Sequence, residues 1–178
     1  MSTQGGMHRA FLALGSRDGD RGASMRAALN LLMQSGVYLV AASSLYETEP
    51  VGLPGSGPLL NGAAEVSTRM SPEALLETCL SVERMLGRRR AKDRPDQGRR
   101  PIDLDLLLFE DQVVLSPHLE VPHPRMHRRR FVLVPLAEIA PRAVHPVLGE
   151  TVAALLARCD DAAWVRLFAP PEAWAPSQ

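Results

Sequence analysis

The sequence predicts an α+β sandwich of ferredoxin-like type, in which helices pack on a mostly antiparallel sheet. Two observations predict it. Strand-like apolar runs alternate with segments of helical periodicity, and the order strand–helix–strand occurs twice along the chain. No repeat, low-complexity block or linker separates the two halves. At 178 residues, 46% apolar and 22% charged, the chain is expected to be a single domain, 1–178, ordered over 8–168 with loose termini at 1–7 and 169–178.

Two strands, a helix and a long loop are predicted in the first half. Residues 9–14 form a strand that Gly15 ends, and residues 37–46 form a second, β-prone strand. Between them, Ser24 is expected to cap a helix that ends at Gly36. Residues 47–58 hold three prolines and three glycines, so we expect a loop there. A loop of this length in a compact domain is usually functional or mobile.

The second half begins with a strand over 59–67 and a helix that Ser71 caps, with Pro72 in its first turn. This helix ends at Gly87, and Cys79 on its apolar face is expected to be core rather than reactive. We expect next a basic loop at 88–98, a buried strand at 102–109 and a short strand at 113–115. A helix interrupted by proline at 125–140 and a short helix at 151–158 follow.

A carboxylate pair interrupts the strand predicted at 102–109. Because side chains alternate along a strand, Asp103 and Asp105 share one face, while Ile102, Leu104 and Leu106 share the other. Two adjacent carboxylates on a buried strand repel each other and cost desolvation energy, which a bound cation relieves. Mg²⁺ suits such ligands when phosphate oxygens complete its shell. The alternative for an isolated Asp-x-Asp is a solvated pair at an edge or turn.

Arginine supplies almost all the positive charge. Eleven arginines lie between Arg84 and Arg130, and Lys92 is the only lysine. Guanidinium binds phosphate through a planar fork, so this cluster near a carboxylate pair indicates a polyphosphate with its metal. Solvated arginine-rich faces are the alternative interpretation.

The remaining composition predicts a cytoplasmic protein. The chain has no apolar run of membrane-spanning length, no signal-peptide pattern and two distant cysteines that are expected to be reduced thiols. The net charge of zero implies no bulk attraction to nucleic acid or membranes.

Short segments in a fixed order resemble one known family over residues 9 to about 158. They are Leu-Ala-Leu-Gly-Ser at 12–16, Ser-Ser-Leu-Tyr-Glu-Thr-Glu-Pro-Val-Gly at 43–52, Leu-Asn at 60–61, Glu83 before Gly87-Arg88, Arg-Pro-Ile-Asp-Leu-Asp at 100–105, Val-Pro-His-Pro-Arg-Met at 121–126, then Arg129 and Phe131. The chain is similar to the hydroxymethyl-dihydropterin pyrophosphokinases (HPPK) of folate biosynthesis. That family transfers pyrophosphate from ATP to the pterin hydroxymethyl group and leaves AMP.

The resemblance implies a role for each matching residue. Asp103 and Asp105 would bind two Mg²⁺ ions, and the catalytic set would be these two with Arg88 and Arg100. Contacts to ATP would come from Glu83, Arg88, Arg90, Arg100, Leu106, His118, His123 and Arg129. The pterin would be bound by Thr48, the backbone of Glu49 and Val51, Asn61, and Phe131 as a stacking ring. Asp105 is also a candidate base for the attacking hydroxyl.

Simpler interpretations remain open for several of these residues. From the residues alone, Phe131 is better explained as core, Asn61 could satisfy a buried backbone group, and His123 could make a structural hydrogen bond. His145 is expected at the surface. One departure from the family is Leu59, where many members carry a second aromatic residue. We also expect the loop from 88 to 98 to order over bound Mg-ATP, because it has little apolar surface to bury.

Two other functions fit parts of the sequence. A nucleotide-sugar transferase would use the Asp-x-Asp, but the chain is short for a nucleotide domain and an acceptor site. An RNA-binding module would use the arginines, but aromatic residues make up only 4% of the chain. The expected partners are therefore ATP and a reduced hydroxymethylpterin, without nucleic acid or membrane, for a monomeric enzyme.

Overall fold

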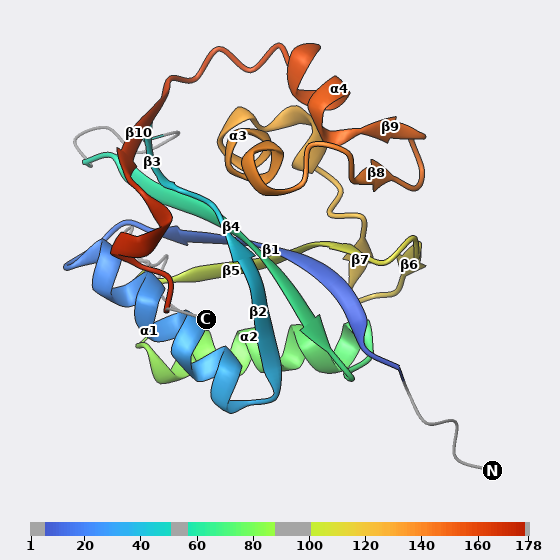
Figure 1. Ribbon diagram of the computed structural model, residues 1–178, viewed down its shortest axis with the longest axis horizontal. Helices are drawn as coiled ribbons and strands as arrows, with labels where there is room; N and C mark the ends of the chain where they lie inside the picture. The colour runs from blue at the N-terminus through green and yellow to red at the C-terminus, as the bar shows by residue number, and fades with distance from the viewer. Residues whose placement is uncertain (1–5, 51–56, 88–100, 177–178) are drawn as a thin grey trace.

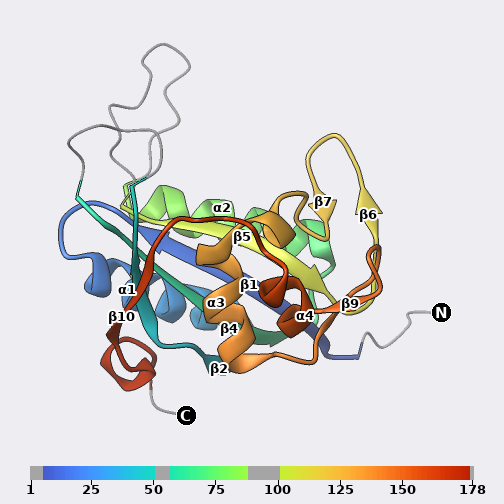
Figure 2. The same cartoon turned by 90° about the horizontal axis from the view of Figure 1, so that it is seen from above.

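The computed structural model describes residues 6–50, 57–87 and 101–176. A central antiparallel sheet has helices on both of its faces (Figure 1, Figure 2). Its strands are β1 (His8–Ser16), β2 (Val37–Ala42), β3 (Leu45–Thr48), β4 (Leu59–Thr68), β5 (Asp103–Phe109) and β10 (Val165–Ala169). The helices are α1 (Arg21–Gln34), α2 (Pro72–Met85), α3 (Arg130–Ile139), α4 (Val152–Ala157) and the 3₁₀ turns η1 (Met126–Arg128) and η2 (Pro171–Ala173). Two small hairpins pair β6 (Val114–Leu115) with β7 (Glu120–Val121), and β8 (Val144–His145) with β9 (Glu150–Thr151).

The order of the strands is β10-β3-β4-β1-β5, and β2 also pairs with β4. All of these pairs are antiparallel. Each of the units β1–α1–β2 and β4–α2–β5 therefore skips over a neighbouring strand, as the ferredoxin-like arrangement requires. The predicted fold class is confirmed.

Alternation along β1 divides the core into two layers. Leu12 and Leu14 belong to the apolar cluster under α1 and α2, whereas Phe11 belongs to the cluster under α3 and α4. Figure 1 and Figure 2 show these two helix pairs on opposite sides of the sheet. Cys79 is fully buried in the first cluster, and burial raises the pKa of its thiol to about 12, so the thiol is an inert part of the core. Both cysteines are free.

The helix starts follow from their caps. Ser71 accepts a hydrogen bond from the Ala74 N–H at 3.2 Å and Pro72 occupies the first turn of α2, as predicted. Helix α1 begins earlier than predicted, because Asp20 rather than Ser24 is its cap and accepts from the Ala23 N–H at 2.9 Å. In α3 the chain continues through Pro135, which was expected to interrupt it. A proline there removes only the bond to the Phe131 carbonyl, near the start of the helix.

The strand predicted over 37–46 is divided at Ser43 and Ser44. The backbone N–H and hydroxyl of Ser44, together with the Tyr46 hydroxyl, donate to the Glu138 carboxylate of α3 at 2.8–3.0 Å. Burial, followed by the hydrogen bond to Glu138, raises the Tyr46 pKa to about 12. The contact ties α3 to the bend between β2 and β3.

The segment after residue 168, which was expected to be loose, is packed up to the end of the described residues. Trp174 is fully buried, and its indole N–H donates to the Ser43 carbonyl at 2.9 Å. Gly62 makes room for the ring, since a Cβ there would lie 3.1 Å from Trp174 Cζ2. His145 is likewise buried rather than at the surface. None of the helices in the described ranges is long and apolar enough to cross a membrane.

Candidate active site

A cavity of about 480 Å³ lies on the α3 side of the sheet. Two rows of paired residues cross β4, β1 and β5 beneath it: Asn61–Gly15–Asp103 and Ala63–Ala13–Asp105. Ala13 and Gly15 carry almost no side chain, so the middle of this floor is open. The cavity is lined by Ala13, Leu14, Gly15, Ser16, Arg17, Glu49, Leu59, Asn61, Asp103, Asp105, Arg128, Arg129, Phe131, Val132 and Asp161.

Asn61 is held in one orientation at this floor. Its Nδ2 donates to Oγ1 of Thr48 at 2.7 Å, and Thr48 is itself 2% exposed. On the other side, a Cβ added to Gly15 would lie only 3.2 Å from Asn61 Oδ1. The Asn61 amide therefore has little freedom to turn. The Asn61 amide therefore donates to a side chain, the Thr48 hydroxyl, rather than to the buried backbone group considered from sequence.

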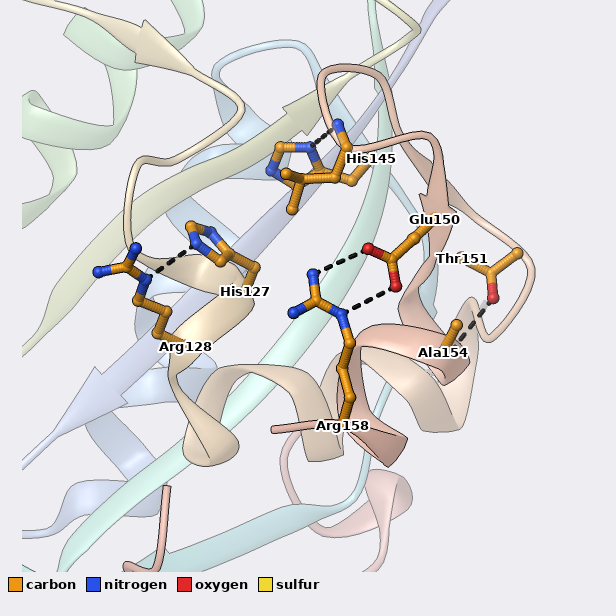
Figure 3. Close-up of polar contacts among 8 residues, drawn as sticks. His127, Arg128, His145, Glu150, Thr151, Ala154 and Arg158 are labelled. Atoms are coloured by element: carbon orange, nitrogen blue, oxygen red, sulfur yellow. Dashed lines mark hydrogen bonds and ion pairs between the residues drawn. The ribbon is translucent and has the colours of Figure 1, made fainter. Parts of the chain in front are cut away.

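The cavity is also lined by residues from η1 and the start of α3: Arg128 ends η1, Arg129 precedes α3 and Phe131 lies in its first turn. The Arg129 guanidinium lies 5.5 Å from the Phe131 ring centroid. Phe131 is only half-buried and lines the cavity, so it is not simply core. The Arg128 Nε donates to His127 Nε2 at 3.1 Å, and His127 meets the buried His145 edge-on at 5.9 Å between centroids (Figure 3).

Asp103 and Asp105 project from β5 toward the same cavity. The backbone N–H between them, that of Leu104, donates to Glu83 Oε1 at 2.8 Å, and Glu83 is 2% exposed. A buried carboxylate of α2 thus fixes the position of this part of β5 relative to α2. Burial lowers the pKa of the Arg129 guanidinium, Arg125 lowers it further, and the negative charges of Asp105 and Asp103 act in the opposite direction. Arg129 is therefore electrostatically coupled to the carboxylate pair.

A second cavity, of about 320 Å³, adjoins the first at Asp105, which lines both. Its lining comes from α2, β5 and the β6–β7 region, and comprises Leu76, Leu104, Asp105, Leu106, Ser116, Pro117, His118, Leu119, Glu120, His123 and Pro124. The Nδ1 atom of His123 accepts from the Arg125 N–H at 3.2 Å. Burial, then Arg129 and Arg125, lowers the His123 pKa. A neutral His123 with this acceptor carries its proton on Nε2, as a donor.

The two cavities collect most of the residues singled out from sequence. The first holds Glu49, Asn61, Asp103, Asp105, Arg129 and Phe131, and the second holds Asp105, Leu106, His118 and His123. Thr48 and Glu83 line neither of these two cavities. Thr48 orients Asn61, and Glu83 holds the Leu104 N–H between Asp103 and Asp105. Val51, Arg88, Arg90, Arg100 and the loop over 88–98 lie outside the described residues.

Sequence reasoning missed Arg17, Arg128 and Asp161 as lining residues. Arg17 follows Gly15 by two positions, and this spacing was the available signal for a shared face. Asp161 accepts hydrogen bonds from the backbone N–H groups of Arg130 and Ala163 at 2.9 and 3.0 Å. No pattern near Asp161 indicated that contact.

The carboxylate pair fits a hard divalent cation. Within the described residues, no group of three or more His, Cys, Asp or Glu side chains is arranged to bind a metal ion. Mg²⁺ does not require such a cage, since it is commonly bound by one or two carboxylates together with phosphate oxygens and water. The position of Asp105 between two cavities fits this shared coordination.

The chain was compared with known proteins and structures. Residues 11–141 match the family described as 7,8-dihydro-6-hydroxymethylpterin-pyrophosphokinase. A Methylorubrum extorquens 2-amino-4-hydroxy-6-hydroxymethyldihydropteridine pyrophosphokinase is 43% identical over 155 residues, covering 86% of this chain and 95% of that protein. The Bacillus subtilis protein of the same name is 46% identical over 131 residues, covering 73% and 77%.

Solved structures show the same fold. A crystal structure of Plasmodium falciparum HPPK-DHPS superposes with a TM-score of 0.70 at 17% identity, covering 88% of this chain. The chain spans 46% of that structure's chain.

Proposed function

The chain belongs to the 7,8-dihydro-6-hydroxymethylpterin-pyrophosphokinase family, and from this premise we propose its reaction and the roles of its residues. The enzyme transfers pyrophosphate from ATP to the hydroxymethyl group of 6-hydroxymethyl-7,8-dihydropterin, giving AMP and the pterin diphosphate, a step of folate biosynthesis. One observation carries the assignment of roles: Asp105 lines two adjoining cavities. A transfer between two bound substrates needs their reacting groups to meet at such a wall.

The first cavity is the pterin site. A flat heterocycle with donors and acceptors along its edge needs apolar faces and a fixed polar partner. The Asn61 amide, oriented by Thr48, supplies the polar partner. Phe131 supplies an aromatic face, and Leu59 supplies an aliphatic one.

The second cavity is the ATP site. The neutral His123 can donate from Nε2 to a phosphate oxygen, and His118 and Leu106 complete the lining. ATP bound there directs its phosphates toward Asp105 and the first cavity. Arg88, Arg90 and Arg100 belong to this site by resemblance to the family.

Magnesium is the cofactor that an ATP-using kinase of this family requires, and we propose that Asp103 and Asp105 would hold two ions. When bound, the metal neutralises phosphate charge and lowers the pKa of coordinated oxygen groups. The chain's own contribution is positioning. Glu83 holds β5 in place through the Leu104 N–H, so both carboxylates keep a fixed position relative to the substrates.

Phosphoryl transfer depends mainly on alignment and on stabilising charge as it spreads in the transition state. Arg129, coupled to both carboxylates, is placed to contribute positive charge, together with Arg88 and Arg100. Asp105, which lies in both cavities, is the candidate base for the hydroxymethyl proton. We also propose that the enzyme acts as a monomer, and that the chain forms a single domain, since both apolar clusters share one sheet.

The test is incubation with Mg-ATP and 6-hydroxymethyl-7,8-dihydropterin, followed by chromatography of the nucleotides. AMP should appear in step with pterin consumption, because the two terminal phosphates move together. ADP formed at the same rate would refute pyrophosphoryl transfer and indicate a simple kinase.

A further inference from the structure

Arg17 is an arginine of the first cavity to which neither the motif comparison nor the proposed mechanism gives a role. It directly follows β1 and lies two residues beyond Gly15, the floor residue between Asn61 and Asp103. Ser16 pairs with Leu60 in the last pair between β1 and β4, and Arg17 is the first residue beyond that pair. Arg17 and Leu59 both line this cavity. An aliphatic and a guanidinium side chain therefore line the pocket near this end of β1 and β4.

The Nε–H of Arg17 has no partner. This nitrogen is buried, and among the residues that the structure describes it has no acceptor to which it donates a hydrogen bond. Other arginines differ: Arg21 donates to the Pro58 carbonyl at 2.6 Å and to Glu47 at 2.7 Å, and Arg128 donates to His127. An unsatisfied buried donor is costly, and such donors in native proteins usually have a ligand or water to bind. Here the donor stands in a substrate cavity.

The location favours the pterin over the nucleotide phosphates. Arg17 lines the first cavity and not the second, where His118 and His123 lie. Along the sheet, Asp105 pairs with Ala13 and Asp103 pairs with Gly15. Position 17 therefore lies on the far side of Asp103 from Asp105, away from the ATP cavity. A guanidinium is flat, stacks on aromatic faces and donates in its own plane.

We propose that Arg17 is a pterin-contacting residue: its Nε–H donates to an acceptor atom of the pterin, and its guanidinium forms with Leu59 the wall on the sheet side of the ring. The inference rests on the proposed function, because it assigns the pterin to the first cavity. The pterin ring would then lie between this wall and Phe131, which comes from α3.

The test compares Arg17→Met, which keeps the length of the stem, with Arg17→Lys, which keeps the charge but not the planar fork. Arg69→Met is the matched control, since Arg69 is exposed and lines neither cavity. Affinity for fluorescent 6-hydroxymethylpterin is measured by quenching, with Mg²⁺ and a non-hydrolysable ATP analogue present. Affinity for the ATP analogue is measured separately, and thermal unfolding checks each variant's fold.

We expect the pterin Kd to rise about tenfold in Arg17→Met, the size expected for losing one charge-assisted hydrogen bond. Arg17→Lys should also weaken pterin binding, while the ATP analogue Kd stays within about twofold and Arg69→Met matches the wild type. Unchanged pterin affinity in both Arg17 variants would overturn the inference. So would a loss confined to the ATP analogue, which would make Arg17 a phosphate contact. AMP formation by the wild-type enzyme separates these outcomes from a failure of the proposed reaction.

Discussion

Gly15→Ala would add one methyl group to the floor of the first cavity, where we propose that the pterin binds. Gly15 lies between Asn61 and Asp103 in the sheet, and its Cβ would stand 3.2 Å from Asn61 Oδ1. Ordinary van der Waals contact with a Cβ begins at 3.4 Å, so the amide has to move by a few tenths of an ångström. Gly15 is not among the glycines with positive φ, so alanine can adopt its backbone conformation.

The expected cost follows from how Asn61 is held. The amide cannot move freely, because its Nδ2 is bonded to Thr48 at 2.7 Å. Displacement weakens that bond or turns the amide away from the pterin, and one hydrogen bond contributes about 1 kcal/mol net. We therefore expect the KM for the pterin to rise about fivefold, with a smaller change in kcat, because roughly 1.4 kcal/mol corresponds to a factor of ten.

Steady-state kinetics with each substrate varied in turn provide the measurement. The KM for ATP should stay near the wild-type value, since Gly15 does not line the second cavity. Gly22→Ala is the control, because its nearest neighbour, Asp20 Oδ1, would be 3.8 Å from the new Cβ. A Gly15→Ala enzyme with wild-type pterin KM, or one that loses pterin and ATP binding equally, would refute the assignment of this floor to the pterin.

Three further changes test other parts of the site. Asp103→Asn or Asp105→Asn should lower kcat by roughly a thousandfold or more while leaving the thermal midpoint unchanged or higher, because a metal ligand is lost and carboxylate repulsion is relieved; near-normal turnover at saturating Mg²⁺ would contradict the metal assignment. Thr48→Val should raise the pterin KM about tenfold by freeing the Asn61 amide, whereas Thr48→Ser should not. Burial lowers the folded-state pKa of His123, His127 and His145, so the unfolded chain binds more protons below about pH 6.5. The free energy of unfolding should therefore fall on acidification through that window; urea unfolding at about pH 7.5 and 5.5 measures it, and His145→Gln should reduce the difference.

The carboxylate pair and the strand that bears it could be predicted because both depend on local pattern. Period-two alternation placed Asp103 and Asp105 on one face, and the structure shows both at the cavity. The start of α2 was equally local, since the Ser71 cap and Pro72 act within one turn.

Features that depend on distant partners could not be predicted. The break at Ser44 is accompanied by contacts to Glu138, 94 residues further along the chain. Trp174 stands in a proline-rich segment that reads as loose, and its burial depends on Gly62 and Ser43. Glu83 was expected to contact ATP by resemblance to the family, and no local pattern indicated that it also accepts a hydrogen bond from the Leu104 N–H. In each case the local pattern was compatible with several partners, and tertiary packing selected one.

The edge position of β5 lets one carboxylate, Asp105, line two cavities, as the proposed mechanism requires. The strand order ends at β5, so within the described ranges only β1 pairs with it in the central sheet. A further strand on the outer side would occupy the space between α2 and the β6–β7 region, where the second cavity lies. An open edge leaves backbone groups exposed, and Glu83 satisfies one of them through the Leu104 N–H. The same contact therefore caps the edge strand and sets the position of Asp103 and Asp105 between the two cavities.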